Sequence, residues 1–470
     1  MSGERAQPAG SRWAAAAVRD ALGLPHATER RPLVFSSVST DSRAIPPGAL
    51  FVALEGERFD GHDHLPAAAA AGATGAVVRQ GTPPVPGLVL FEVPDTLRAF
   101  GQLARARRRT LKGPVIAITG TNGKTSTKEM LAAVLRTRYV THATRANLNN
   151  LVGVPLTILE APPDTEALVV EAGANRPGEV ARYREIIEPS VTIVTNAVAG
   201  HLEGFGSLAG VVEEKLSLTE GVPLAIVGTD PSDLATGARK RARKVLTAGL
   251  RGADLTPDKV TLDESARPVI TIGGTTLVLS ARGLHQADNA IRVWAAVDAL
   301  GFDREASARA LETFSIPAGR GELLQESGLT ILNDCYNANP QSFRAAIATA
   351  AALRGKRRLV FVAGTMRELG VDSSALHLEV ADALVELNPD LLAVVGDFVP
   401  ALERHAGALG DRLITAADPV ALAPILTQRL EGNEIIVLKA SRGVALERIL
   451  PALAARAKNP GAPPAPLRSR

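Results

Sequence analysis

The chain has 470 residues, too many for one ordinary hydrophobic core, so its length predicts two to four domains. Hydrophobic residues make up 46% and charged residues 21% of the sequence, a balance typical of globular proteins with sizeable cores, and the formal net charge is only +3. The single cysteine, Cys335, excludes an internal disulfide framework and a zinc site built from several cysteines.

Location and partners are indicated by what the sequence lacks. No apolar run approaches the roughly 20 residues needed to span a bilayer. Residues 1–10 are polar and small and carry no charged-then-apolar signal pattern. A lone cysteine suits a reducing compartment, so we expect a cytoplasmic enzyme without membrane insertion. The basic stretches 105–112 and 239–244 have no interleaved aromatics, so we expect solvated helix faces or linkers and no nucleic-acid partner.

The residue pattern up to position 113 indicates a first domain. Proline and glycine clusters separate three short apolar runs: 49–54, 75–78 and 87–93. This pattern predicts short strands with intervening helices. The basic stretch 105–112, followed by Gly113-Pro114, indicates a helix end and a domain boundary.

From Val115 onward the pattern changes to near-continuous apolar runs, each followed by a stretch of helical length. The runs are 115–119, 167–170 and 191–195. Strands that are apolar throughout are typical of a parallel sheet covered on both faces. We therefore predict a doubly wound α/β domain over residues 114–316.

A second boundary is expected near residues 316–319, Ile-Pro-Ala-Gly. Beyond it the alternation of buried strands and helices resumes, with strands at 359–363, 391–395 and 435–438. This alternation predicts a smaller, nucleotide-fold-like domain over 317–458. Residues 459–470, rich in proline and alanine, are expected to form a disordered tail.

The sharpest functional signal is the segment Gly120-Thr-Asn-Gly-Lys-Thr125, which stands between a predicted strand and a helical stretch. Glycines let successive backbone N–H groups turn toward phosphate oxygens, and the helix N-terminus adds a positive dipole end. Lys124 is then expected against the β- and γ-phosphates of ATP, and the Thr125 hydroxyl on Mg²⁺. The strict motif requires a glycine five residues before Gly123, where this chain has Ile118. The candidate ATP-binding residues are Gly120, Thr121, Asn122, Gly123, Lys124, Thr125 and Ser126.

Two further side chains are candidates for the metal. Glu171 closes the strand 167–170, and side chains at the carboxyl edge of a parallel sheet face the ligand crevice. Mg²⁺ prefers oxygen ligands and keeps several waters, so one or two carboxylates suffice; the alternative is an exposed strand-end glutamate. His201, between glycines in the segment 200–206, either ligates metal, orients a phosphate or is a surface histidine.

Taken together, these motifs resemble the Mur ligases, and the resemblance extends from Asp41-Ser-Arg43 to Arg442. The segments that occur in the family's order are 120–125, 147–150, 171–173, 201–210, 283–285 with Asn289, 334–340 and 439–442. Within the family, the stretch Tyr336-Asn-Ala-Asn-Pro340 and the long segment that begins at His201 resemble the member that joins D-alanyl-D-alanine to UDP-N-acetylmuramoyl-tripeptide.

The resemblance implies an N-terminal uridine-nucleotide domain (1–113), a central P-loop ATPase domain and a C-terminal Rossmann-like domain. For the nucleotide it implies an adenine contact by Asn289 and ATP contacts by Arg320 and Asp334 of the closing C-terminal domain. Glu171 and His201 match magnesium ligands. The residues implied to act in catalysis are Lys124, His201, Lys215 and Arg320.

For the substrates, the resemblance implies that Ser42 and Arg43 bind the uridine-diphosphate end. The other residues implied to contact substrate are Asn147, Asn149, Asn150, Tyr336, Asn337, Asn339, Ser342, Lys439, Ser441 and Arg442. The chain departs from the family's frequent pattern at Ala146, Thr365 and Ala440, which stand in place of a glycine, an acidic residue and a glycine.

Lys215 lies fourteen residues past His201, on a helical stretch where the family carries a carbamylated lysine. A neutral lysine amine captures carbon dioxide and becomes an anion that can bridge to magnesium. The amine must be partly deprotonated, which burial near cations promotes and which the adjacent Glu213 and Glu214 oppose if they lie close. The alternative is a solvated lysine.

The resemblance thus implies an ATP-dependent ligase that forms an acyl phosphate on the peptide carboxylate and transfers the acyl group to the amine of D-alanyl-D-alanine. Separately, we expect the protein to be a monomer. The products expected are the UDP-linked pentapeptide for peptidoglycan, ADP and phosphate. Three alternatives stay open at this point: another Mur ligase or a folylpolyglutamate-type ligase, a P-loop kinase or ATPase, and a non-catalytic module that binds a UDP-sugar.

Overall fold

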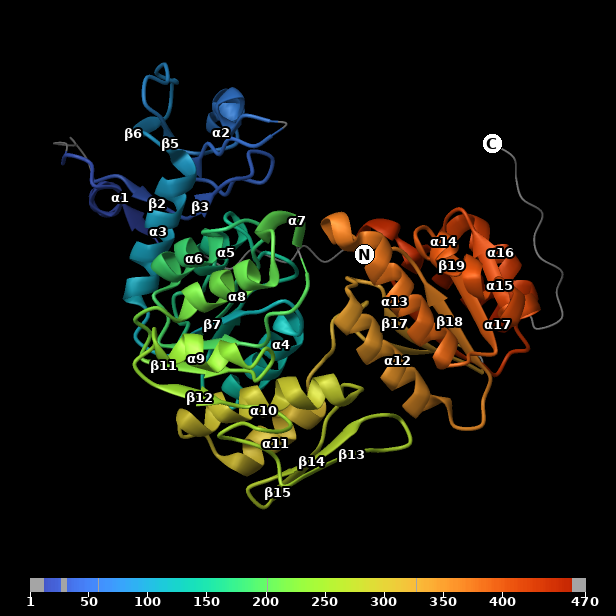
Figure 1. Ribbon diagram of the computed structural model, residues 1–470. Helices are drawn as coiled ribbons and strands as arrows, with labels where there is room; N and C mark the ends of the chain where they lie inside the picture. Colours follow the sequence, from blue (N-terminus) through green and yellow to red (C-terminus); the bar gives the residue numbers. More distant parts are fainter. Residues whose placement is uncertain (1–11, 27–31, 58, 201, 327, 459–470) are drawn as a thin grey trace.

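The computed structural model describes residues 12–26, 32–57, 59–200, 202–326 and 328–458. Three α/β units follow one another along the chain, the blue N-terminal unit, the central unit from cyan to yellow and the orange-to-red C-terminal unit (Figure 1). The predicted fold class is therefore confirmed. Within the described ranges, no helix is long and apolar enough to cross a bilayer.

The N-terminal unit is built on a four-stranded parallel sheet in the order β3-β4-β5-β6, beside a small antiparallel ribbon of β1 and β2. Its strands are β1 (Trp13–Ala14), β2 (Val34–Phe35), β3 (Val38–Ser39), β4 (Leu50–Val52), β5 (Gly75–Arg79) and β6 (Val89–Val93). Its helices are α1 (Ala15–Leu22), α2 (Leu65–Ala70) and α3 (Thr96–Thr110). The three apolar runs expected to be strands are confirmed, because side chains on both faces of β4 are buried.

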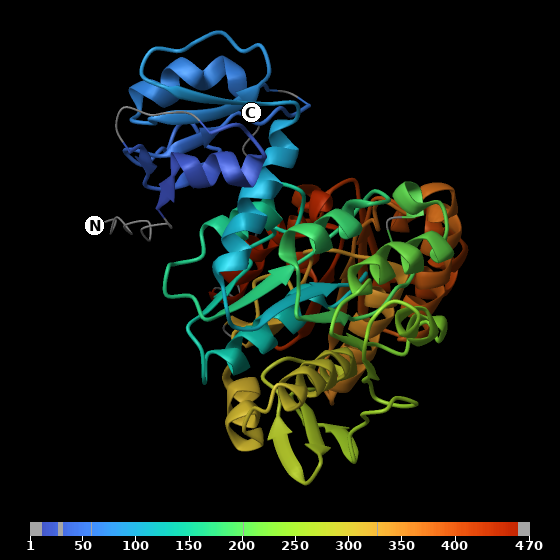
Figure 2. The same cartoon turned by 90° about the vertical axis from the view of Figure 1, so that its left-hand side faces the viewer.

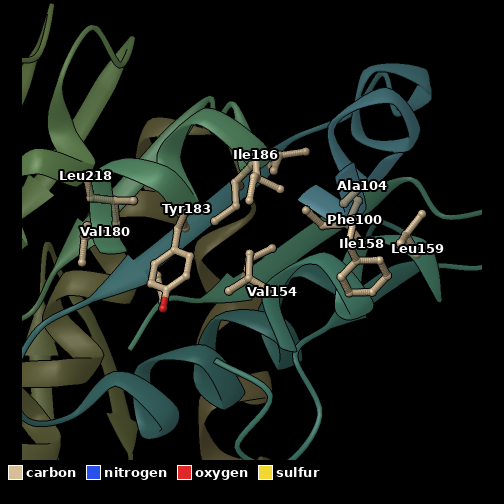
Figure 3. Packing of buried hydrophobic residues seen from close by; sticks show 14 of the residues in the cluster. Phe100, Ala104, Val154, Ile158, Leu159, Val180, Tyr183, Ile186 and Leu218 are labelled. Atoms are coloured by element: carbon tan, nitrogen blue, oxygen red, sulfur yellow. The ribbon is translucent and has the colours of Figure 1, made fainter. Parts of the chain in front are cut away.

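Helix α3 leaves the N-terminal unit and packs along the central unit, so it joins the two (Figure 2). Its apolar face contacts α5 and α6, where Phe100 and Ala104 lie near Ile158 and Leu159 (Figure 3). Its arginines reinforce this packing, since they donate to main-chain carbonyls and to one carboxylate of the central unit. These bonds are Arg107 to the carbonyls of Ala161 and Pro162, Arg108 to those of Ile187 and Glu188, and Arg105 and Arg109 to the Glu188 carboxylate. The basic stretch 105–112, which we expected to be a solvated helix face or a linker, therefore connects the N-terminal and central units.

The central unit contains a six-stranded parallel sheet in the order β12-β11-β10-β7-β9-β8. Its strands are β7 (Val115–Thr119), β8 (Thr141–Ala143), β9 (Ala167–Glu171), β10 (Val191–Val194), β11 (Leu224–Val227) and β12 (Val245–Thr247). The strands predicted at 115–119, 167–170 and 191–195 are confirmed as β7, β9 and β10. The next two strands of the chain, β8 and β9, lie on one side of β7, with β9 beside it. The later strands β10, β11 and β12 lie on the other side, with β10 beside β7. The carboxyl end of β7 is therefore a topological switch point, where such sheets bind ligands.

Helices cover both faces of the central sheet, as the continuous apolar strands require. Ile116 and Ile118 pack on the face covered by α4 and α10, whereas Val115 and Ala117 pack on the face of α3, α5 and α6. The helices are α4 (Lys124–Leu135), α5 (Gly153–Leu159), α6 (Glu179–Ile187), α7 (Leu202–Phe205), α8 (Leu208–Leu216), α9 (Asp233–Arg239), α10 (Leu284–Ala299) and α11 (Arg304–Thr313).

The central unit also carries a three-stranded antiparallel sheet that we did not predict, although Gly273-Gly274 between two strand-like runs is a usable hairpin signal. Its strands are β13 (Lys259–Leu262), β14 (Pro268–Ile272) and β15 (Thr275–Val278). Only alternate residues of β14 are fully buried, so the strand lacks the continuous apolar signal of the parallel sheet.

The C-terminal unit has a six-stranded sheet in the order β16-β17-β21-β18-β19-β20, parallel except for β16. Its strands are β16 (Glu322–Glu326), β17 (Leu329–Asp334), β18 (Leu359–Ala363), β19 (Leu391–Val395), β20 (Leu413–Ala416) and β21 (Ile435–Lys439). Its helices are α12 (Pro340–Arg354), α13 (Ser373–Glu386), α14 (Phe398–Ala401), α15 (Ala406–Leu409), α16 (Pro419–Gln428) and α17 (Leu450–Lys458). The predicted strands are confirmed as β18, β19 and β21, and the unit lies beside the central unit on the side of α4 (Figure 1).

We predict that Phe100→Ala lowers the free energy of unfolding by about 3–5 kcal/mol, because it leaves a cavity in the packing between α3 and the central unit. Urea unfolding followed by circular dichroism measures the loss. As a control, Val371→Ala removes a fully exposed side chain and changes stability by no more than about 0.5 kcal/mol. Equal midpoints for the two variants would show that α3 does not hold the units together.

Candidate active site

The phosphate loop connects β7 to α4 and depends on two glycines. Gly120 has a φ of 143° and Gly123 a φ of 80°, a region that residues with a Cβ rarely adopt. A Cβ on Gly120 would lie 2.0 Å from Thr195 Oγ1, and one on Gly123 would lie 2.4 Å from Asn289 Oδ1. Ile118, where the strict motif has a glycine, is buried inside β7. Strand β7 thus continues through the position where the strict motif has its first glycine, and the loop begins only at Gly120.

Lys124 stands at the first position of α4 with its ammonium inside the loop. Its Nζ donates to the carbonyls of Gly120 and Thr121 at 2.8 and 3.0 Å. Burial lowers the pKa of Lys124 to about 8, Glu171 opposes this shift and Arg320 adds to it. A loop that already holds a desolvated cation favours an incoming phosphate, whose negative charge stabilises that cation.

Thr125 and Glu171 form an oxygen-rich pair beneath the loop. The Thr125 hydroxyl donates to Glu171 Oε2 at 2.9 Å, and Asn149 Nδ2 donates to Glu171 Oε1 at 2.9 Å. Glu171 is buried at the carboxyl end of β9. A hydroxyl and a carboxylate are ligands that Mg²⁺ accepts while it keeps several waters. The part of the chain that the structure describes holds no group of three or more His, Cys, Asp or Glu side chains suited to a metal.

Lys215 is buried at the end of α8 and does not line the cleft described below, whereas His201 lies outside the described residues. The Lys215 Nζ lies 5.3 Å from the centroid of the Phe205 ring. Burial and, next, the charge of Lys124 lower the pKa of Lys215 to about 7, although Glu214 raises it. Glu214 accepts hydrogen bonds from the backbone N–H groups of Gly178 and Val180, both at 2.7 Å.

A cavity of about 550 Å³ lies between the central and C-terminal units and brings together residues from both. The predicted site residues that line it are Thr121, Asn122, Gly123, Lys124, Ser126, Asn147, Asn149, Asn150, Glu171, Asn289, Arg320, Asp334, Tyr336, Asn337, Ser342, Lys439 and Arg442. Those not on its wall are Gly120, Thr125, Lys215, Asn339, Ser441, Ser42 and Arg43. Segments more than 300 residues apart in sequence therefore share one interdomain cleft.

The C-terminal unit contributes a set of cations to this cleft. The Arg320 guanidinium carbon lies 3.8 Å from the centroid of the Tyr336 ring and that of Arg442 lies 5.1 Å away, so both guanidinium groups contact the ring. Lys439 Nζ donates to Asp334 Oδ2 at 2.7 Å. Together with Lys124, these groups put four cations on the wall of the cleft, which also carries five carboxylates, Asp334 among them.

Some predicted substrate residues instead hold backbone. Asn150 Oδ1 accepts from the N–H groups of Val152 and Gly153 at 3.1 and 2.8 Å. The hydroxyl of Ser441 accepts from the N–H of Arg367 at 2.9 Å. Both side chains therefore fix the loops that line the cleft.

Ala146, one of the departures from the family pattern, has a φ of 49°. This is the left-handed region, which favours glycine. The left-handed backbone at position 146 therefore explains why the family often has a glycine there.

Ser42 and Arg43 lie far from the phosphate loop, in the N-terminal unit. Arg43 Nε and Nη2 donate to the two oxygens of Asp41 at 2.8 and 2.9 Å, which lowers the pKa of Asp41 to about 2. Asp41, but neither of the two predicted residues, lines a groove of about 740 Å³ that continues to Arg145 and to Leu156 of α5. Arg43 is thus placed to orient a carboxylate at the rim of this groove.

Among the residues of the cleft and its border that the sequence interpretation missed are Asn196, Asp230, Gln286 and Gln341. Asn196 follows β10, so its place at the carboxyl edge of a parallel strand was a usable signal. Gln286 Nε2 donates to Ser126 Oγ at 3.3 Å, and its Oε1 accepts from Asn289 at 3.2 Å. Nothing local in the sequence marks Asp230 or Gln341, because their partners lie in other units.

Comparisons with known proteins agree with this architecture. Residues 34–108 match the description "Mur ligase family, catalytic domain", residues 118–297 "Mur ligase middle domain" and residues 319–442 "Mur ligase, glutamate ligase domain". The "UDP-N-acetylmuramoyl-tripeptide--D-alanyl-D-alanine ligase" of Escherichia coli (strain K12) is 36% identical over 433 residues, which cover 90% of this chain and 94% of that protein.

Solved structures show the same likeness. A crystal structure of MurF from Acinetobacter baumannii superposes with a TM-score of 0.85 at 28% identity and covers 95% of this chain and 99% of that one. The structure of MurF ligase from Thermotoga maritima in complex with ADP superposes with a TM-score of 0.81 at 27% identity and covers 90% of this chain and 98% of that one. Together with the interdomain cleft and its phosphate loop, these likenesses establish that the chain belongs to the Mur ligase family.

Proposed function

We propose that this chain is an ATP-dependent ligase that joins D-alanyl-D-alanine to the peptide carboxylate of UDP-N-acetylmuramoyl-tripeptide. The observation that carries the proposal is the cleft that Lys124 of the phosphate loop lines together with Arg320, Lys439 and Arg442 of the C-terminal unit. Relatives that bear the name of this activity match about nine tenths of the chain, and one solved relative holds ADP.

The proposed reaction has the two steps that the family resemblance implies. The peptide carboxylate attacks the γ-phosphorus of ATP, the bond from that phosphorus to ADP breaks, and an acyl phosphate forms. The amine of the dipeptide then attacks the acyl carbon, loses a proton, and phosphate leaves. The carboxylate and the triphosphate are both anions, so positioning and charge neutralisation by Lys124 and Arg320 are the protein's main contribution.

The proposal includes Mg²⁺, for which Thr125 and Glu171 supply suitable oxygen atoms and to which the resemblance adds His201 and a carbamylated Lys215. When bound, the ion neutralises charge on the phosphate oxygens. The residues assigned to ATP and substrate contacts by the resemblance belong to this proposal, with Asn289 at the adenine and Ser42 and Arg43 at the uridine-diphosphate end.

We also infer that the enzyme is cytoplasmic and acts as a monomer. Cys335, the one cysteine of the sequence, is a free, buried thiol, which suits a reducing compartment that contains ATP. The three domains are proposed to divide near Gly113 and Ile316, where the chain passes from one sheet to the next.

A P-loop kinase or plain ATPase is the main competing function. Such an enzyme has the same phosphate loop. Its reaction does not require the groove beside Asp41 or the two guanidinium groups near Tyr336. A kinase also predicts phosphate transfer without an amide product, so the two functions are separable by their products.

We predict that ATP turnover by the purified protein with UDP-N-acetylmuramoyl-tripeptide yields the pentapeptide product only when D-alanyl-D-alanine is present, as measured by mass spectrometry. Lys124→Ala should abolish turnover and leave uridine-nucleotide binding nearly intact, because no residue of the phosphate loop lines the groove beside Asp41. ATP consumption that gives no amide product with any dipeptide would contradict the proposal. Equal loss of turnover and uridine-nucleotide binding would contradict the separation of the sites.

The pKa of Lys124 predicts a pH dependence. The ammonium loses its charge as pH rises through about 8, so kcat/KM for ATP should fall above that pH by about tenfold per unit. Bound triphosphate stabilises the cation and raises its pKa, so kcat should persist to higher pH than kcat/KM. Initial rates between pH 7 and 10 measure both profiles, and identical profiles would argue against Lys124 as the group that titrates.

The pKa of Lys215 predicts carbamylation. Above about pH 7 its amine is largely neutral and reacts with carbon dioxide, whereas below that pH protonation blocks the reaction. With ¹³C-labelled bicarbonate, the carbon NMR spectrum should show a carbamate signal that fades as pH falls below 7. Lys215→Arg keeps a long side chain that cannot be carbamylated, so a signal of equal strength in this variant would place the carbamate on another group.

A further inference from the structure

The backbone of the phosphate loop is fixed by its own unit. The N–H of Asn122 donates to Asn196 Oδ1 at 2.9 Å, and Thr195 Oγ1 donates to the Asn122 carbonyl at 2.6 Å. Both partners follow directly from strand β10. The side chain of Asn122 has no part in these bonds and is left to interact across the cleft.

The Asn122 side chain bonds to the start of helix α12 in the C-terminal unit. Its Nδ2 donates to Gln341 Oε1 at 2.8 Å and to Asn339 Oδ1 at 3.2 Å. In return, Asn339 Nδ2 donates to Asn122 Oδ1 at 2.7 Å. The two donors and the acceptor of this amide are thus all directed at the C-terminal unit.

The directions of these hydrogen bonds are fixed at both ends. Gln341 Nε2 donates to Asp230 Oδ2 at 2.8 Å, and a carboxylate only accepts, so the oxygen of Gln341 must face Asn122. At the other end, Asn339 Oδ1 accepts from the N–H of Ser342 at 2.9 Å as the N-cap of α12, so its NH₂ group must face Asn122. The amide orientations are therefore set by their neighbours.

We propose that Gln341 and Asp230 are positioning residues for the ligation, and that with Asn122 and Asn339 they form an amide clamp that holds the phosphate loop against the C-terminal unit. The proposal rests on the proposed function, because it assigns these residues a role in that reaction. Asp230 follows strand β11 of the central unit, so the clamp bonds α12 to two separate loops of that unit.

The clamp matters because the cleft is complete only when the two units meet. Lys124 comes from one unit and Arg320 from the other, and both must neutralise anions that approach within bonding distance. Three of the four hydrogen bonds of the clamp join neutral amides and are individually modest, so the clamp can open for substrates and close around them. Its amides lie beside the loop that binds the phosphates, so closure and nucleotide position are linked.

The test uses a pair of substitutions that reverse the roles of donor and acceptor. Gln341→Glu places a carboxylate against Asp230, and we expect kcat for ligation to fall by about tenfold or more, with the thermal unfolding midpoint unchanged. Asp230→Asn alone retains an acceptor for Gln341 and should stay within about threefold of the wild type. The double variant lets the introduced amide donate to the introduced carboxylate, and its kcat should return to within about threefold of the wild type.

Gln428→Glu is the matched control, because it makes the same chemical change at an exposed position of α16 in the same unit. It should leave kcat unchanged. The proposal is overturned if Gln341→Glu ligates at the wild-type rate, or if the double variant remains as slow as Gln341→Glu. A residue that served only the stability of its own unit would show no rescue from a substitution in the other.

A second measurement separates failure of the clamp from failure of the proposed function. Small-angle X-ray scattering with a non-hydrolysable ATP analogue reports how far apart the units lie, without any acceptor. The wild type and the double variant should be compact, and Gln341→Glu more extended. If the wild type forms no amide product, the proposed function fails while scattering still tests the clamp; if the wild type ligates but all variants scatter alike, the clamp alone fails.

Discussion

Two anions must meet in one cleft, and the rest of the structure depends on this constraint. A carboxylate and a triphosphate repel each other strongly in a desolvated site, so opposite charge has to be fixed in place beforehand. The chain places Lys124 within a loop of main-chain carbonyls and brings Arg320, Lys439 and Arg442 to the wall of the same cleft. A cleft between separate units allows the anions to enter while it is open and places the cations around them when it closes.

The carboxyl edges of two parallel sheets supply the rigid part of this arrangement. Glu171 ends β9, Asp334 ends β17 and Lys439 ends β21, so each functional side chain is fixed by a strand that is buried on both faces. Strand ends cannot shift without breaking sheet hydrogen bonds, so charges carried there hold their positions. Loops that the sheets do not fix are held by side chains such as Asn150 and Ser441.

The joint between the first two units is stiff, in contrast to the cleft. The arginines of α3 donate to carbonyls and to Glu188 of the central unit, and Phe100 packs into the core beside α5. The N-terminal groove is therefore held at a set place relative to the phosphate loop. The contact between the central and C-terminal units includes the small amide clamp, which suits a joint that opens and closes.

The sequence alone determined the elements whose signals are local. Runs that are apolar throughout predicted β7, β9, β10, β18, β19 and β21, because a strand buried on both faces has no polar positions to obscure the pattern. The glycines at 120 and 123 marked the phosphate loop, because only glycine fits its backbone. The sheet of β13, β14 and β15 was not predicted, because buried and less buried residues alternate along a strand such as β14 and no continuous apolar run results.

Only the tertiary structure decided which residues meet. Asp230 and Gln341 acquire their role from an approach between units that no local pattern encodes. Asn339, expected at the substrate, caps α12 and bonds to Asn122 instead of lining the cleft. The lowered pKa of Lys215 likewise depends on the burial of this side chain in the folded central unit. From the sequence alone, the adjacent glutamates suggest that its pKa is raised. Local sequence sets backbone shape and strand burial, but hydrogen-bond partners and desolvation arise only when distant segments pack together.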